Sequence, residues 1–289
     1  MDFKNIFGKA LKYPRNSNIY FFLLLVNVIV FLARIPVSEY ETQVALGLQP
    51  ANPMFYILSL GFAIANLIIS VFIIGFYLHN SHGYYTKKKY GNLADSVSPS
   101  KKGFFHLLGS LIIIIALAVM AFFIFGGFSA FIYLPETISI LLLITGIIAA
   151  CIIVYLFFLA PAYATIETKN AASALVSSYH TVKKNKISTL IFLVLAILIA
   201  VAINFVGAVP IISYSLIVGP YAISSLGQGP LMLFSFFQLL FTTYATLFLY
   251  SSLSNFYSEV RGIKTKEEEK KVVRKAAIKR KAPARRKKK

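Results

Sequence analysis

FFHLLGSLIIIIALAVMAFFIFGGF, residues 104–128, contains no charged side chain and is dominated by aliphatic and aromatic residues. An α-helix of about 20 apolar residues crosses the roughly 30 Å hydrocarbon core of a bilayer. Five further stretches reach that length and composition: about 18–36, 54–79, 138–161, 187–208 and 229–254. Together they predict an all-α fold, a polytopic membrane helical bundle with about six transmembrane helices.

The composition excludes an ordinary soluble domain. Hydrophobic residues make up 58% of the chain, charged residues 13%, and the mean hydropathy is +0.74. Soluble domains are about 45–50% apolar and about 25% charged. Cys151 is the single cysteine, which excludes an internal disulfide and a CxxC redox or metal site.

Lysines and arginines between the apolar stretches indicate the orientation, because they accumulate in short cytoplasmic loops. They occur in the stretches 1–17, 80–103 and 162–186 and in the tail after Tyr257. The intervening stretches 37–53 and 209–228 and the turn near Glu136 carry none. This alternation predicts a multi-pass protein of the cell membrane with both termini in the cytoplasm.

We therefore divide the chain into three parts: a cytoplasmic N-terminal arm (1–17), a six-span transmembrane domain (18–257) and a basic cytoplasmic tail (258–289). The segment 209–228 is interrupted by glycines and prolines. We predict it to be re-entrant or interfacial, because a full crossing would carry the basic tail to the outside.

The tail holds fifteen lysines and arginines against four glutamates, so its expected partner is anionic. Each cation near an anionic membrane surface contributes about 1 kcal/mol. Aromatic side chains that stack on bases are missing from the tail, which makes lipid headgroups the first expectation and ribosomal RNA the alternative. A homo-oligomer or another membrane protein stays open as a further partner. The predicted contacts with anionic lipid or RNA are Lys183, Lys184, Lys186, Lys270, Lys271, Arg274, Lys279, Arg280, Lys281, Arg285 and Arg286.

Polar side chains inside the spans are amides rather than charges. No Asp, Glu, Lys or Arg falls in the middle of a predicted span, which disfavours proton relays and ion-coupled pumps. Arg34 lies near the external end of the first span, where it is expected to snorkel or to pair with Glu39 or Glu41. Amides can form hydrogen bonds across helix interfaces worth about 0.6–2 kcal/mol. The predicted interhelical polar residues are Asn27, Asn66, Asn204 and Gln238.

The sequence predicts no catalytic, cofactor-binding or metal-binding residues. His79 and His82 are three residues apart, but two histidines without a carboxylate or cysteine do not make a zinc site. No phosphate-binding loop, nucleophile elbow or H-E-x-x-H motif occurs.

The loop at 162–186 contains a predicted helix over residues 170–182 with Asn170 as its N-cap. Ala171, Leu175, Ser178 and Tyr179 are expected to face the membrane, with the following lysines reaching lipid headgroups.

This region also carries a resemblance. A span ending in FFLAPAYATIE (157–167), then NAASALVSSYHTVKKN (170–185), then a strongly apolar span resembles the polytopic membrane domains of uncharacterised prokaryotic, largely archaeal, proteins. It is also similar to the membrane domain fused to some glycerophosphodiester phosphodiesterases. With HGYYTKKKYGN (82–92), the similar region covers about residues 75–255. The resemblance implies a helical membrane domain, and it implies no activity, because no phosphodiesterase catalytic domain is present.

Three functions follow from these features. The first is a non-enzymatic scaffold, assembly or permease-like factor whose basic tail binds anionic lipid or RNA. The second is a transporter or channel that uses the segment 209–228. The third and least favoured is an intramembrane enzyme acting on lipids, because ionisable groups are missing from the middle of the spans.

Overall fold

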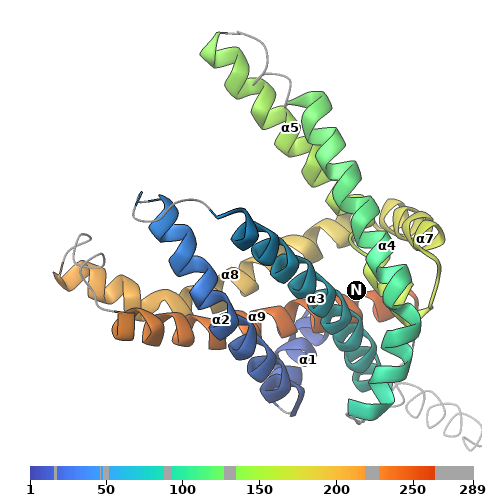
Figure 1. Cartoon of the computed structure of the whole chain (residues 1–289). Helices are drawn as coiled ribbons and strands as arrows, with labels where there is room; N and C mark the ends of the chain where they lie inside the picture. Colours follow the sequence, from blue (N-terminus) through green and yellow to red (C-terminus); the bar gives the residue numbers. More distant parts are fainter. Residues whose placement is uncertain are drawn as a thin grey trace, which may run out of the picture.

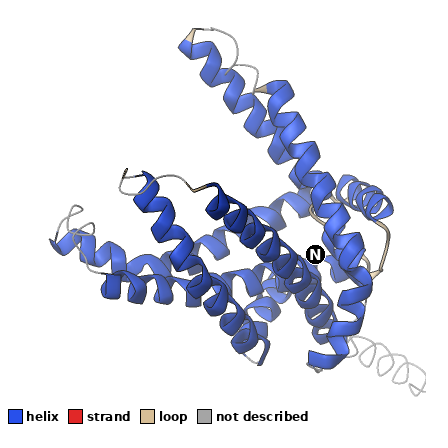
Figure 2. Ribbon diagram, viewed as in Figure 1, coloured by secondary structure: helices blue, strands red, loops and turns tan. Residues whose placement is uncertain are grey.

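The computed structural model describes residues 1–15, 18–45, 47, 52–87, 93–126, 135–218 and 228–263. Every regular element in these ranges is a helix (Figure 2), which confirms the predicted all-α class. The helices are α1 (Phe3–Arg15), α2 (Asn18–Ala45), α3 (Pro53–Lys87), α4 (Leu93–Phe125), α5 (Glu136–Phe157), α6 (Ala160–Ile166), α7 (Ala171–Lys184), α8 (Lys186–Val218) and α9 (Gln228–Val260).

Six of the described helical segments are long and apolar enough to cross a membrane, as predicted. They cover Asn18–Val37, Pro53–Thr86, Ser100–Phe125, Glu136–Ile166, Lys186–Val218 and Met232–Val260. Consecutive spans form three hairpins, α2–α3, α4–α5 and α8–α9, whose tips point in different directions (Figure 1). Because only 6% to 22% of the residues in the most apolar part of each span are buried, most of these side chains face outward, where lipid would surround them.

Residues 209–218, the first part of the segment predicted to be re-entrant or interfacial, are helical and continuous with the preceding span. These residues continue α8 to Val218, with Pro210 inside the helix. A continuous helix satisfies the backbone within one segment, which is the cheaper solution at membrane depth, and membrane helices tolerate an internal proline. Residues 219–227 lie outside the described residues.

The protein core lies at one end of the molecule, which we call the base. The base comprises α1, α6, α7 and the adjoining ends of α3, α4, α8 and α9, and the three hairpins diverge from it (Figure 1). Leu159 and Ala160 are fully buried there, and the rings of Phe192 and Phe256 stack with centroids 4.1 Å apart. The base is therefore packed like the interior of a soluble domain.

The N-terminal arm is part of this core rather than a free extension. Ile6, Ala10 and Tyr13 recur at helical spacing along one face of α1, and all three are fully buried. Asn255 of α9 donates a hydrogen bond to the Ile6 carbonyl at 3.1 Å. Four of the 13 residues of α1 are basic, and the prediction of a cytoplasmic arm rested on these charges rather than on the apolar face.

The α4–α5 hairpin is held by a close approach of two glycines. A Cβ on Gly146 would lie 2.8 Å from the Phe122 carbonyl oxygen and 2.9 Å from the Cα of Gly126. Small residues let membrane helices approach closely and gain van der Waals contact. By contrast, a Cβ on Gly61 of α3 would meet nothing within 4 Å, so that glycine does not mark a helix contact.

Candidate functional site at the base

A charged cluster at the base joins the α6–α7 connection to the end of α9. Glu167 forms ion pairs with Lys169 and Arg261, each at 3.0 Å. The buried hydroxyl of Tyr257 donates a hydrogen bond to the same carboxylate. The ring of Tyr163 lies beneath both cations, with Lys169 Nζ at 4.9 Å and Arg261 Cζ at 5.8 Å from its centroid. We call these five residues the Glu167 cluster.

The local backbone explains how Glu167 is presented. Glu167 is the C-cap residue of α6, and its N–H donates to the Tyr163 carbonyl. Thr168 follows with φ 50°, in the left-handed region that a β-branched residue seldom adopts. Asn170 then caps α7, its Oδ1 accepting from the Ser173 N–H at 2.8 Å, as predicted for this helix. A tight turn between two capped helices therefore holds the carboxylate.

The cluster favours the ionised carboxylate. Burial by itself would raise the pKa of Glu167. Hydrogen bonds from Tyr257 and Lys169 and the charges of Arg261 and Lys169 outweigh that effect and hold the pKa below its ordinary value. Arg261 responds in the opposite sense: burial would lower its pKa, but the negative charge of Glu167 raises it. Both groups stay charged, so the arrangement suits a stabilising ion pair better than a proton-transfer site.

A serine and a histidine meet beside this cluster, but their hydrogen bonds do not suit a nucleophile. His82 Nδ1 lies 2.9 Å from Ser258 Oγ. Ser258 Oγ also lies 2.9 Å from the Ser254 carbonyl oxygen, to which it donates its only proton. Both bonds form together only when His82 Nδ1 carries the proton, so His82 is the donor in this pair and not the base that a serine nucleophile requires.

Metal-ligating side chains do not gather within the described ranges. No group of three or more His, Cys, Asp or Glu is found there. His79 and His82 share the end of α3, as the sequence indicated, and His82 is committed to Ser258.

The predicted anion contacts at α7 and α8 lie on the outside of the base. Lys183, Lys184 and Lys186 are exposed. Tyr155 of α5 donates to the Lys186 carbonyl at 2.8 Å, which fixes the junction between α7 and α8. Lys101 and Lys102 of α4 are also exposed. We call these five lysines the basic rim. The predicted contacts in the tail, from Lys270 to Arg286, lie outside the described residues.

The face of α7 expected to lie on the membrane packs on protein instead. Leu175 and Ser178 are buried, and Ser178 donates to the Leu156 carbonyl at 3.1 Å. The expectation treated α7 as an isolated amphipathic helix, whereas α5 and α6 cover its apolar side. As a result, α7 belongs to the base rather than lying freely in the membrane surface.

Three of the four intramembrane amides form hydrogen bonds between helices. Asn27 of α2 donates to Thr243 of α9 at 2.9 Å. Asn204 of α8 accepts from Thr242 at 2.9 Å, and Gln238 donates to the Asn204 carbonyl at 3.4 Å. Asn66 differs, because it lines a cavity between α2 and α3 together with Arg34.

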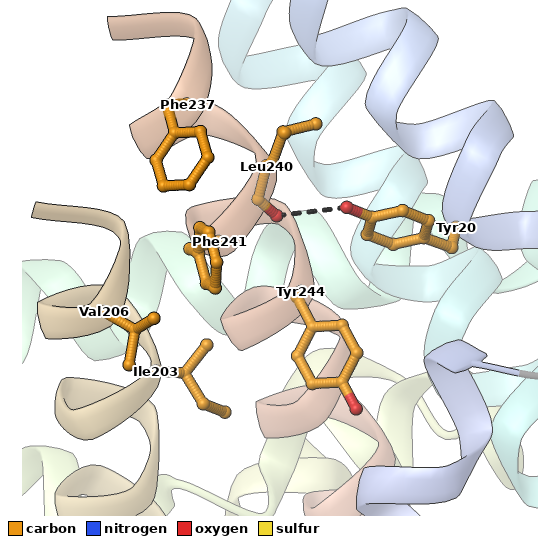
Figure 3. A pocket seen from close by; sticks show the side chains of 7 residues that line it. All are labelled: Tyr20, Ile203, Val206, Phe237, Leu240, Phe241 and Tyr244. Carbon is orange, nitrogen blue, oxygen red and sulfur yellow. Dashed lines mark hydrogen bonds between the residues drawn. The ribbon is translucent and has the colours of Figure 1, made fainter. Parts of the chain in front are cut away.

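An apolar groove lies between α2, α8 and α9, with a volume of about 440 Å³ (Figure 3). Tyr20 closes one side through a hydrogen bond to the Leu240 carbonyl at 3.3 Å. Tyr244 donates to the Leu11 carbonyl of α1 at 2.6 Å. Apolar lining at the depth of the spans suits an acyl chain of a lipid. The groove is lined by Tyr20, Ile203, Val206, Phe237, Leu240, Phe241 and Tyr244.

No protein-family model, curated protein or solved structure matches this chain. Two features of the site escaped the sequence reading. Glu167 and Tyr257 are 90 residues apart, and no spacing rule connects them. The apolar face of α1 could have been found from the spacing of Ile6, Ala10 and Tyr13, which follow one another at intervals of four and three residues.

Proposed function

We propose that this protein is a non-enzymatic integral membrane scaffold whose base faces the cytoplasm and binds anionic phospholipid. The observation that carries the proposal is the basic rim on the packed base. Exposed lysines gather at the base, while Arg34 is the one basic residue at the hairpin tips within the described residues. Short cytoplasmic segments of membrane proteins carry such an excess of Lys and Arg.

The packing of the helices that carry the lysines supports lipid binding. A flexible basic segment must be ordered when it binds, whereas α7, which carries Lys183 and Lys184, already packs on α4, α5 and α6. Tyr163 contributes through a hydrogen bond of 2.6 Å between its hydroxyl and Thr181 Oγ1. Each cation near an anionic surface adds about 1 kcal/mol, so three adjacent lysines at the α7–α8 junction would favour phosphatidylglycerol over phosphatidylcholine.

The apolar groove supports the scaffold or assembly role rather than catalysis. It offers apolar surface at membrane depth. The ionisable groups Glu167 and Arg261 are engaged with each other, and His82 is engaged with Ser258. A scaffold needs such stable, satisfied contacts, while a catalytic site needs groups poised to change protonation.

Native mass spectrometry of the detergent-purified chain tests the proposal. We expect the protein to retain several-fold more phosphatidylglycerol than phosphatidylcholine. The variant K183Q/K184Q/K186Q should lose that preference, and the charge-preserving variant K183R/K184R/K186R should keep it. An equal preference in the Gln and Arg variants would contradict a role for the rim.

RNA is the alternative partner, and co-sedimentation with ribosomes in detergent separates it from lipid. If the full chain co-sediments with ribosomes and a chain shortened to residue 263 does not, the tail binds RNA, and the lipid proposal fails for the tail. We expect no co-sedimentation, because the tail lacks the aromatic side chains that stack on bases.

A further inference from the structure

A second cavity lies inside the α2–α3 hairpin, on the side away from the base. It has a volume of about 230 Å³ and is lined by Arg34, Val37, Ser59, Phe62, Ala63 and Asn66. The two helices contact each other on both sides of it. Tyr77 donates to the Ile19 carbonyl at 3.2 Å near the base, and the rings of Tyr40 and Phe55 lie 3.7 Å apart at the tip. The cavity is thus framed at two ends, and we call it the Arg34 pocket.

The position of Arg34 inside the span suits a role in binding an anion. Arg34 lies three residues before Val37, where the span of α2 ends, or about 5 Å along the helix at 1.5 Å per residue. Charged residues within spans are costly and typically mark a binding or transport site. The side chains of Glu39 and Glu41 lie outside the described residues. Arg34 shares the cavity with residues of α3.

Both helices contribute polar and apolar side chains to the lining of the pocket. The guanidinium of Arg34 offers a planar set of donors, and the amide of Asn66 and the hydroxyl of Ser59 face the same cavity from α3. Guanidinium groups bind phosphate through paired, charge-assisted hydrogen bonds. Val37 and Phe62 supply an apolar wall, which would accommodate the glycerol and upper acyl region next to a phosphate.

We propose that the Arg34 pocket binds the phosphodiester of a phospholipid in the leaflet at the hairpin tips, opposite to the leaflet that contacts the base. The phosphate accepts hydrogen bonds from Arg34 and Asn66, and the acyl chains leave between α2 and α3 into the bilayer. This site recognises the phosphate rather than the net charge of the headgroup. It therefore accepts a zwitterionic lipid, unlike the basic rim.

Native mass spectrometry with phosphatidylcholine as the probe tests this site without engaging the charge preference of the rim. We expect R34Q to lower the retained phosphatidylcholine about tenfold, because it removes a charge-assisted, paired contact. N66L should lower it by a few-fold. K12Q, which removes an exposed cation of α1 outside the basic rim, is the matched control and should retain the wild-type amount.

Two further measurements identify the ligand chemistry. Dioleoylglycerol has the same chains without the phosphate, and it should be retained poorly and equally by wild type and R34Q. Millimolar inorganic phosphate should leave the bound phosphatidylcholine in place. Displacement by inorganic phosphate would mean that the pocket takes free phosphate, and this result would overturn the lipid assignment.

A conservative variant and two folding controls keep the test decisive if R34Q fails to fold. R34K keeps the positive charge but loses the fork of donors, and it should retain about a third of the wild-type lipid. Circular dichroism and gel filtration establish that each variant is folded. Equal retention of phosphatidylcholine by folded R34K, N66L and wild type would overturn the proposal.

Discussion

Replacing Glu167 with alanine should loosen the base, and the structure allows the cost to be worked out. Glu167 Oε1 is the acceptor for the Tyr257 hydroxyl, and Tyr257 is only 1% exposed. A buried donor left without its partner costs about 1–3 kcal/mol. The two ion pairs add less, because the side chains of Lys169 and Arg261 are 33% and 47% exposed, and exposed pairs contribute about 0.2–1 kcal/mol each.

We therefore expect E167A to lower the free energy of unfolding by about 2–4 kcal/mol. E167Q keeps an oxygen acceptor for Tyr257 and loses the charge, so it should cost about 1 kcal/mol. The assay is reversible unfolding in mixed micelles of sodium dodecyl sulfate and a mild detergent, followed by circular dichroism. Y257F is the matched control, because it removes the hydroxyl and leaves both ion pairs.

The double variant E167A/Y257F decides whether the two groups act together. If the hydrogen bond is the main contribution, the double variant costs less than the sum of the single variants by about 1 kcal/mol. The Tyr257 hydrogen bond does not stabilise the base as inferred if E167A costs less than about 0.5 kcal/mol or if the two single costs simply add.

Three further outcomes follow from the same structure. G146A should destabilise the α4–α5 hairpin by about 1–3 kcal/mol in the same unfolding assay, because its Cβ would meet the backbone of α4. The control variant G61A should leave the stability unchanged. Equal losses of stability in the two variants would contradict the close approach of α4 and α5 at Gly146. N204A should lower the free energy of unfolding by about 0.6–2 kcal/mol, because it removes the hydrogen bond with Thr242. The double variant N204A/T242V should lose less stability than the sum of the two single variants. The stabilisation from Glu167 should be complete above about pH 5 and should decline as the pH falls through its lowered pKa, because the unfolded carboxyl binds a proton more readily. Wild type should then lose more stability on acidification than E167Q, and parallel unfolding curves from pH 6 to about pH 3 would contradict this assignment.

The span architecture was predictable because apolar length leaves the backbone little choice. A long uncharged run such as residues 104–128 satisfies its backbone in lipid only by forming a helix, and residues 104–125 of that run form the apolar part of α4. The same logic explains why residues 209–218 are helical. Pro210 was taken as the beginning of an interrupted segment, yet it lies within α8.

The N-cap of α7 could also be predicted from the sequence. Asn170 was expected to begin a helix, and its side chain accepts from the Ser173 N–H. The packing partner of α7 could not be predicted from the sequence, because an apolar face suits lipid and protein alike. Leu175 was therefore predicted to face the membrane, although it is buried within the base.

The sequence by itself determined the number of helices that can cross a membrane and the uneven distribution of charge along the chain, since both depend on composition within short windows. Only the tertiary structure decided which distant residues meet. Glu167 reaches Tyr257 and Arg261, and Arg34 shares a cavity with Asn66. These meetings depend on how the helices pack, and packing between apolar surfaces in a bilayer follows from shape and hydrogen bonding rather than from hydrophobicity.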